Sequence, residues 1–440
     1  MPPPPGGTVD FDVLLLGGGL SLLYAPLLAA RGLRVAVVEQ HRAGQAHREW
    51  NASWAELQAL VQDGLLDQAA LEGLLLARYQ HGVCRWHGGG EQQVRGVLDC
   101  AVDAAALLQL ARQRAEAQGV TFFDACRCLA VGANDSGVRV LCRRDAGELC
   151  LRARLVLDGR GAQSPYGQTD LICPTVGGVM EGLRFDPRVG DILATTQHVE
   201  DGRQYIWEGF PGRAGQIAIY LFYYAPRRSV GPGALQALYE RFFATLSQFK
   251  SGRGELVRPT FGLIPGWSRL CRGPAAPHQR IVLVGDAAAR HSPLTFCGFG
   301  ATLRSLQPVS QGIAAFVASD RLGGRPVLPA SLVDDRPLHT ATGALARVMA
   351  QPPPNDPAAL NTLLNVAFGT LEEMGNEAFA ALLQDRMALG QFTEFLQQTS
   401  KRFPQVYPLV WRSLGSAALL RWSAAVGTSW LRHRVRWRAA

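Results

Sequence analysis

The chain has 440 residues, 48% of them hydrophobic and 18% charged, a composition typical of a globular protein with two or three domains. Its nine cysteines include no C-x-x-C pair and no spacing typical of zinc ligands, which argues against a disulfide scaffold and against a metal site. The net charge of +8 permits an anionic partner, but no nucleic-acid recognition motif accompanies it, so we expect no nucleic acid.

The N-terminal residues 1–9 are rich in proline and glycine, and we expect a disordered tail there. They include neither the charged nor the apolar region of a secretory signal. No uninterrupted apolar run reaches the roughly 18 residues of a transmembrane helix. These features predict a cytoplasmic protein that is soluble or lies on a membrane surface.

The first ordered pattern is a βαβ unit. A buried-strand run at 11–16 is followed by three glycines, a helix-compatible segment at 21–31 and a second buried-strand run at 34–39. This order is typical of a doubly wound parallel sheet that binds a dinucleotide.

The turn after the first strand carries a first cofactor signal. Gly17 and Gly19 would allow the backbone to approach a pyrophosphate, and Glu39 would accept hydrogen bonds from ribose hydroxyls. Glu39 follows Gly17 by 39 − 17 = 22 residues, close to the spacing of about 20 typical of this fingerprint. The third glycine position holds Leu22, so taken alone the motif is also compatible with an ordinary glycine turn.

The rest of the chain alternates between helical and β patterns. Apolar spacing predicts helices over 52–80 and 100–118, short strands over 119–158 with turns at 134–137 and 145–147, a mostly β segment at 170–260, and helices beyond residue 300. A further helix is predicted near 233–249, inside the β segment.

Two later turns complete the cofactor signal. Asp158-Gly159 ends a predicted strand and resembles a turn that flavoprotein hydroxylases place beside the dinucleotide. Gly285-Asp286 ends another strand and resembles the flavoprotein G-D segment in which the acid binds the ribityl chain. The loop and helix start that follow would face the flavin ring; their candidate residues are Pro293, Gly298 and Gly300. Each turn alone could be generic, but three in this order predict FAD binding.

These signals predict an α/β fold: an FAD-binding Rossmann-like domain with an inserted β-rich substrate domain and a helical C-terminal part. The expected boundaries are 10–170 and 276–330 for the FAD-binding domain, 171–275 for the substrate domain and 331–440 for the helical region.

Two longer motifs resemble a known family. The segment 47–53 reads His-Arg-Glu-Trp-Asn-Ala-Ser, and 291–300 reads His-Ser-Pro-Leu-Thr-Phe-Cys-Gly-Phe-Gly. Both resemble the CruA/CruP class of FAD-dependent lycopene cyclases, the second being more similar to CruA. The resemblance covers roughly residues 10–310. It implies cyclisation of lycopene or another acyclic carotenoid to γ- or β-carotene, with reduced FAD and no net redox change, in carotenoid biosynthesis of a photosynthetic bacterium.

Such a reaction needs a protonated acid in an apolar pocket. Glu208, in Tyr-Ile-Trp-Glu-Gly-Phe, is the first candidate, because burial among aromatic side chains would keep its carboxyl protonated. A solvated glutamate at a strand end is the alternative, and the F-L-E-E-T string of plant-type cyclases is absent. His291 is a second catalytic candidate, or a structural histidine. We expect Arg48 to contact the cofactor.

A carotenoid dissolves in membranes, so the resemblance implies contact with a thylakoid or plasma membrane. The segment 419–438 interleaves tryptophan with arginine, which suits an interfacial helix on anionic lipid or a basic helix packed on the domain. A flavin-dependent isoprenoid reductase or hydroxylase and a non-catalytic pigment-binding paralogue remain alternatives. The oligomeric state is not predicted.

Overall fold

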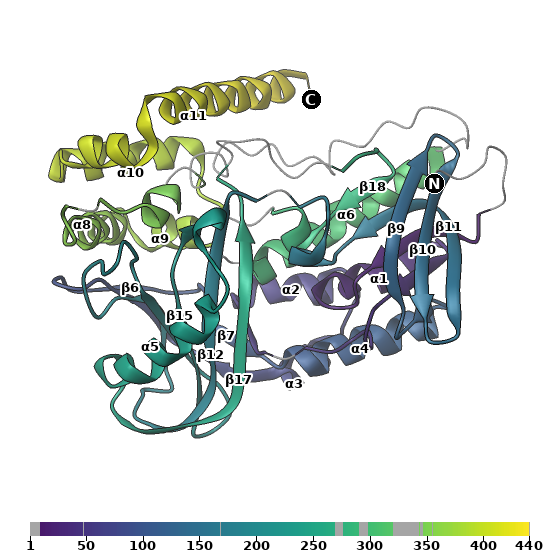
Figure 1. Ribbon diagram of the computed structural model, residues 1–440, viewed down its shortest axis with the longest axis horizontal. Coiled ribbons are helices and arrows are strands. Elements are labelled where there is room, and N and C mark those ends of the chain that lie inside the picture. The colour runs from purple at the N-terminus through teal and green to yellow at the C-terminus, as the bar shows by residue number, and fades with distance from the viewer. Residues whose placement is uncertain are drawn as a thin grey trace.

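The computed structural model describes residues 9–46, 48–167, 169–268, 276–289, 298–319, 343, 346–353 and 355–439. Figure 1 shows two lobes built around different β-sheets, with the C-terminal helices stacked over one of them. The predicted α/β fold with an inserted β-rich part and a helical C-terminal part is confirmed.

The first sheet has the order β8-β2-β1-β11-β10-β9, with β18 beside β11. β1 is parallel to both β2 and β11, so the predicted βαβ unit forms the centre of the sheet. β1 and β2 are apolar runs that are buried over most or all of their length, as expected for central parallel strands. The strands are β1 (Phe11–Leu16), β2 (Val35–Val38), β8 (Thr121–Phe123), β9 (Arg127–Asn134), β10 (Gly137–Arg144), β11 (Gly147–Asp158) and β18 (Ile281–Leu283).

Helices cover one face of this sheet, and their apolar side chains join those of β1 in one buried cluster. The antiparallel strands β9, β10 and β11 turn at the two predicted turn sequences. The helical segments of this lobe are η1 (Leu20–Leu23), α1 (Tyr24–Ala29), α2 (Trp54–Gln62), α3 (Gln68–Gly73), α4 (Ala104–Ala117), η2 (Gly161–Gln163), η4 (Gly285–Ala287) and α6 (Gly298–Ser319).

The prediction of helical structure over 52–80 is wrong in part. The chain leaves the helical conformation after α3 and forms a strand, because its apolar run pairs with a partner about 25 residues further along the chain. A small sheet of order β3-β7-β4 results. Its strands are β3 (Trp50–Ala52), β4 (Leu75–Arg78) and β7 (Cys100–Val102).

The second sheet has the order β16-β12-β15-β14-β13-β5-β6, with β17 on the other side of β12. Two of its strands come from residues 81–94, well before the segment predicted to be β-rich. The strands are β5 (His81–Arg85), β6 (Glu91–Val94), β12 (Leu171–Leu183), β13 (Val189–Ala194), β14 (Ile206–Pro211), β15 (Gln216–Phe222), β16 (Ala225–Pro226) and β17 (Gly252–Gly266).

Alternation along the strands divides the second sheet into two faces. Trp207 and its neighbours of the same parity pack against the predicted helix α5 (Ala234–Phe249), with η3 (Arg227–Ser229) just before it. Residues of the opposite parity, Ile206 and Phe210 among them, face the C-terminal helices. Glu208 shares the parity of Phe210 and therefore points away from α5.

The C-terminal helices are α8 (Ala359–Glu373), α9 (Asn376–Leu383), α10 (Leu389–Arg402) and α11 (Val406–Ala439). α11 bends at Gly415, where φ is 75°, and lies outermost in Figure 1. Within the described part of the chain, no helix combines the length and the apolarity needed to cross a membrane.

Candidate functional site

The turn after β1 shows why its glycines are needed. Gly17 has φ 98°, and a Cβ there would lie 2.8 Å from the carbonyl oxygen of Gly159, so this glycine allows two turns to touch. A Cβ on Gly18 would meet the Cβ of Ala43 at 2.5 Å. At Gly19 the same construction finds no atom within 4 Å. Space is therefore open at Gly19 and filled at the other two.

Glu39 holds this turn at the end of β2. Its Oε2 accepts a hydrogen bond from the backbone N–H of Gly18 at 2.8 Å, and its Oε1 accepts one from the N–H of His41 at 2.9 Å. The remaining lone pairs of both oxygens can accept bonds from a ribose. The structure places Glu39 behind the glycine turn.

The second turn is built around Asp158, which is fully buried. Its carboxylate accepts hydrogen bonds from the hydroxyl of Ser164 at 2.8 Å and from Nη2 of Arg160 at 2.8 Å. The N–H of Gly159 donates to the carbonyl of Leu16 at 2.8 Å, which ties the turn to β1. Asp158 therefore shapes the turn, and Gly159 and Gly161 present its backbone to the cavity described next.

The third turn follows β18, where Gly285 has φ 56°. Gly285 and Asp286 face the same cavity, and so does Gly298 at the start of α6. Gly300 follows Gly298 by two positions and packs against the side chain of Glu56. The predicted candidates His291 and Pro293 lie outside the described residues.

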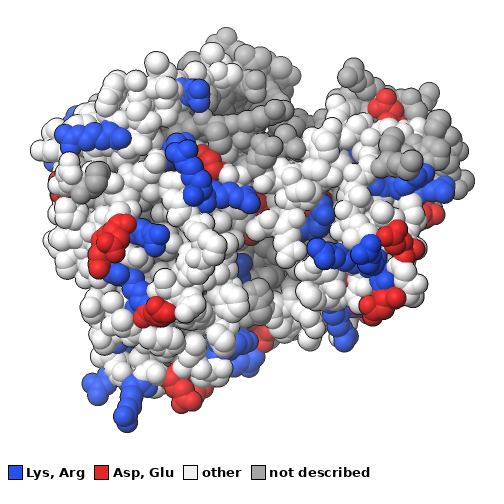
Figure 2. All heavy atoms as spheres, viewed as in Figure 1, with Lys and Arg blue, Asp and Glu red and all other residues white. Residues whose placement is uncertain are grey.

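One cavity of about 380 Å³ joins these turns to the second sheet, a size within the usual range for ligand pockets, about 300–1,000 Å³. Figure 2 shows the molecule hollowed between its two lobes on this face. The wall contributed by the second lobe is mostly aromatic and aliphatic, and Glu208 supplies the one carboxyl group among its described residues. Its side chains include Cys173, Thr175, Glu208, Phe210, Tyr220, Phe222 and Ile264.

Glu208 on β14 lies directly opposite Tyr220 on β15. Its side chain is partly exposed and lines the cavity. Burial raises the pKa of Glu208 to about 8, although the nearby charge of Arg48 acts in the opposite direction. Among the described residues no group hydrogen bonds to its carboxyl. The side chain can therefore be a neutral acid at pH 7.

Arg48 also lines the cavity, and its charge acts on both Glu208 and Tyr220. The structure thus brings this predicted cofactor residue close to the predicted acid. Its neighbour Glu49 forms an ion pair with Arg258 of β17 at 2.9 Å. Burial raises the pKa of Glu49, and Arg258 counteracts part of that effect.

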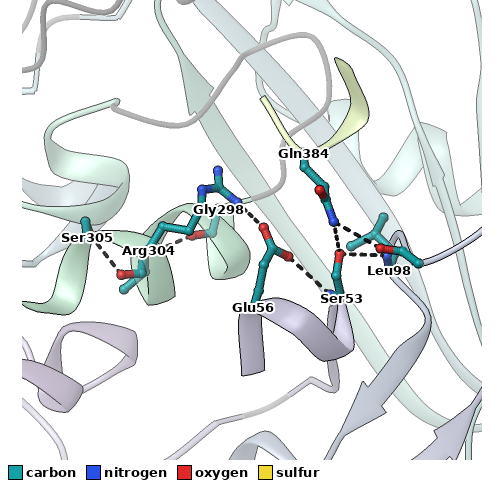
Figure 3. Close-up of polar contacts among 9 residues, drawn as sticks. Ser53, Glu56, Leu98, Gly298, Arg304, Ser305 and Gln384 are labelled. Carbon is teal, nitrogen blue, oxygen red and sulfur yellow. Dashed lines mark hydrogen bonds and ion pairs between the residues drawn. The ribbon is translucent and has the colours of Figure 1, made fainter. Parts of the chain in front are cut away.

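Sequence reasoning missed a polar network behind the cavity wall, shown in Figure 3. Glu56 forms an ion pair with Arg304 and accepts a hydrogen bond from the N–H of Ser53 at 3.2 Å. Gln384 donates to the Ser53 hydroxyl at 2.6 Å. The spacing Ser-x-x-Glu is the sequence signature of a helix capping box, so the pair Ser53 and Glu56 could have been found, whereas Arg304 and Gln384 could not.

Comparisons with known proteins fit this geometry. No family model matches the chain, and no curated protein matches it in sequence. A geranylgeranyl bacteriochlorophyll reductase-like protein from Thermoplasma acidophilum has a TM-score of 0.60 at 14% identity, over 93% of this chain and 100% of that chain. The p-nitrophenol 4-monooxygenase PnpA from Pseudomonas putida has a TM-score of 0.60 at 15% identity, over 86% and 98%. The halogenase PltM, in a complex with FAD, has a TM-score of 0.59 at 12% identity, over 97% and 96%.

The chain has the fold of the FAD-binding monooxygenases and reductases. These alignments span both lobes of this FAD-binding fold, because each covers most of the chain. The fold predicted from the glycine turns and their order is thereby confirmed.

Proposed function

We propose that the chain binds FAD and acts as a lycopene cyclase that forms β-ionone rings, giving γ- or β-carotene. The family resemblance of segments 47–53 and 285–300 supports the substrate. One observation carries the mechanism: the carboxyl of Glu208 faces the same cavity as the three candidate cofactor turns.

The residues of the first lobe fit FAD. The open space at Gly19 suits close approach of a pyrophosphate, and the partly free oxygens of Glu39 suit a ribose. Asp286, beside the start of α6, suits the ribityl chain. When bound in its reduced form, FAD supplies negative charge that favours a nearby carbocation.

The protein residues would carry out the proton transfers. Glu208 gives its proton to a terminal C=C bond of lycopene, and the next double bond attacks the resulting cation to close the ring. The ring cation then loses a proton, which the Glu208 carboxylate can take back, so that the product is neutral, the acid is restored and the reaction has no net redox change. The faces of Phe210 and Tyr220 would stabilise the cation through their ring quadrupoles.

Arg48 would act after the proton has left. Burial raises the pKa of Glu208 by more than the nearby Arg48 charge lowers it, so the protonated form is favoured before the reaction. Once Glu208 is a carboxylate, the guanidinium is an ion partner in the same cavity, and it makes the buried anion less unfavourable.

The pH dependence of the rate follows from the pKa of Glu208, about 8. The active form is protonated, so the rate of cyclisation should be constant below this pKa and fall about tenfold for each further pH unit above it. Single-turnover conversion of lycopene in detergent micelles between pH 5.5 and 9.5 measures this profile. A rate that increases through pH 8 would show that the carboxylate form is the active one.

The proposed function is tested by pigment analysis of a lycopene-accumulating bacterial host that expresses the chain. We expect γ- or β-carotene. FAD-loaded protein with unchanged lycopene, including in extracts supplied with a reductant, would contradict the cyclase. It would favour the non-catalytic pigment-binding alternative if lycopene copurified with the protein.

The second candidate is a flavin-dependent isoprenoid reductase. The similarity of the fold to a geranylgeranyl reductase-like protein favours it. A reductase consumes one NAD(P)H for each double bond that it reduces, whereas a cyclase yields an isomer of its substrate. The mass of the product therefore separates the two: an unchanged mass indicates cyclisation, and an increase of two hydrogens per bond indicates reduction.

We further propose that the enzyme reaches its substrate by lying on a membrane through α11. Among the described side chains of α11, four large apolar ones are more than half exposed: Tyr407 at 66%, Trp411 at 58%, Leu420 at 72% and Leu431 at 58%. Arg421 beside them is also exposed. The side chains of Trp430 and of 432–439, which carry most of the predicted Trp/Arg pattern, lie outside the described residues.

The variant Trp411→Ser/Leu420→Ser should bind vesicles of anionic phospholipid several-fold more weakly than the wild type in a sedimentation assay. A second exposed apolar pair, Phe243 at 54% and Phe261 at 59%, lies on α5 and β17 and provides the matched control Phe243→Ser/Phe261→Ser. If only the control variant loses binding, the membrane contact belongs to α5 and β17 and our assignment to α11 is wrong.

A further inference from the structure

We propose that the ion pair between Glu56 and Arg304 is a positioning pair. It holds the first turn of α6 at the cofactor cavity, and it determines the net charge behind that turn. The inference rests on the proposed binding of FAD. It concerns two residues that do not face the cavity themselves.

The pair joins helices that are far apart in sequence. Arg304 donates from Nη1 to Oε1 of Glu56, across 248 residues of chain. The other carboxylate oxygen of Glu56 caps α2 through the N–H of Ser53. Figure 3 shows Glu56 lying between Arg304 and Ser53. One side chain therefore fixes the start of α2 relative to α6.

The carboxylate of Glu56 packs closely against α6 at Gly300. A Cβ at Gly300 would lie 2.6 Å from Oε2 and 2.7 Å from Oε1 of Glu56. Any larger residue would push the carboxylate away from the helix. The backbone conformation does not explain this glycine, because its φ is not in the left-handed region.

The turn that Glu56 holds forms part of the cavity wall. Gly298, Phe299 and Thr302 all line the cavity. The ring of Phe299 packs on that of Trp50, with centroids 4.9 Å apart, and the Thr302 hydroxyl donates to the carbonyl of Gly298 at 2.9 Å. Movement of this turn would therefore displace both the helix start and an aromatic wall.

The pair also places two opposite charges behind the helix start, where the N–H groups of the first turn favour negative charge. The Glu56 side chain is 6% exposed and the Arg304 side chain 20% exposed, so neither charge is fully screened by water. Among the described residues, Nε and Nη2 of Arg304 find no acceptor. Glu56 is thus the counter-ion of Arg304, and loss of either residue leaves an uncompensated charge near the cavity.

The same network connects the cavity to the C-terminal helices. Gln384, just after α9, donates to the Ser53 hydroxyl at 2.6 Å and to the carbonyl of Gly96 at 3.0 Å. The N–H of Leu98 donates to the same hydroxyl at 3.3 Å, and Leu98 itself lines the cavity. The helical region is therefore bonded to the segment that holds α6.

The test is the midpoint potential of the bound flavin in the full-length protein, measured for Glu56→Gln, Arg304→Gln and the double variant. Reduced flavin is more negative than oxidised flavin. Glu56→Gln leaves the half-buried positive charge of Arg304 without its partner and should raise the potential, whereas Arg304→Gln leaves the buried negative charge of Glu56 and should lower it. We expect about a tenfold change in the ratio of reduced to oxidised FAD affinity in each direction, which is about 30 mV for a two-electron couple. The double variant should lie between the two.

A role limited to stability would give a different result. In that case both single variants would lower the melting temperature without shifts of opposite sign in the potential, and the inference would be overturned. Asp191→Asn is the matched control, because Asp191 is a buried partner of Arg85 that does not line the cavity; it should leave the potential unchanged. If a Gln variant does not fold, the conservative variants Glu56→Asp and Arg304→Lys keep the charges and should restore a potential close to that of the wild type.

This experiment does not depend on the identity of the carotenoid. Wild-type protein that holds no FAD would refute the proposed function, and the inference with it. Wild-type protein that holds FAD and cyclises lycopene, while its variants show no shifts of opposite sign, would refute the inference alone.

Discussion

Glu208→Gln should lower the rate of lycopene cyclisation by about 10²–10⁴-fold, the usual contribution of a general acid, while FAD stays bound. The amide has nearly the shape of the protonated carboxyl but cannot give up a proton. Glu208 stands on the wall contributed by the second sheet, across the cavity from the glycine turns, so the substitution should not disturb the cofactor. Single-turnover product formation and flavin absorbance measure the two effects.

The matched control is Glu181→Gln. Glu181 belongs to the same sheet but is exposed and accepts a hydrogen bond from Gln216 at 2.7 Å. The Glu181→Gln variant should cyclise lycopene at the same rate as the wild type. Equal rates for Glu208→Gln and wild type would remove Glu208 from the mechanism and leave the proton to another donor.

Glu208→Gln should also stabilise the fold at alkaline pH. The folded-state pKa of Glu208, about 8, lies above its ordinary value of 4.5, so between these values the folded state holds a proton that the unfolded state has released. The free energy of unfolding of the wild type therefore falls as pH rises from 4.5 to 8. Gln removes this loss, and at pH 8 the variant should be more stable by about 1–3 kcal/mol. The gain should vanish near pH 4.5.

The sequence predicted the parts of the fold that depend on local order. Continuous apolar strands followed by Gly17, Asp158 and Gly285 fixed the parallel sheet, because each turn follows the strand that positions it. Glu208 could be proposed because it lies among aromatic residues in the segment predicted to be β-rich. Such a neighbourhood suggests a buried carboxyl, and it does not predict what lies opposite that carboxyl in the folded protein.

The parts that were not predicted depend on contacts between distant segments. The strands at 81–94 join the second sheet through β13, where Val189 pairs with His81, 189 − 81 = 108 residues earlier. Arg304 meets Glu56 only because α6 packs against α2. Arg48 lies near Glu208 because the loop after β2 reaches the second lobe. None of these long-range contacts produces a periodic pattern in the sequence, so they cannot be predicted from a single sequence.

Gly19→Val should abolish retention of FAD while leaving the apoprotein folded. The structure has no atom within 4 Å of a Cβ at this position, so a side chain there meets no steric clash. The backbone angles, φ −85° and ψ −133°, lie outside the main allowed regions for a residue with a Cβ, so we expect a loss of some stability without unfolding. The side chain would enter the space expected for the pyrophosphate and block its approach to the backbone. Flavin absorbance after gel filtration, together with thermal unfolding of the apoprotein, separates the two effects.

Gly17→Ala is the contrasting variant at the same turn. Its Cβ would lie 2.8 Å from a backbone oxygen of Gly159, and φ is 98°, so we expect it to destabilise the apoprotein by about 1–3 kcal/mol. A structural turn without a ligand would make both substitutions matter only through stability. Normal FAD content in a folded Gly19→Val protein would therefore contradict our placement of the cofactor at this turn, whereas loss of FAD from a folded protein would assign the open space to the cofactor.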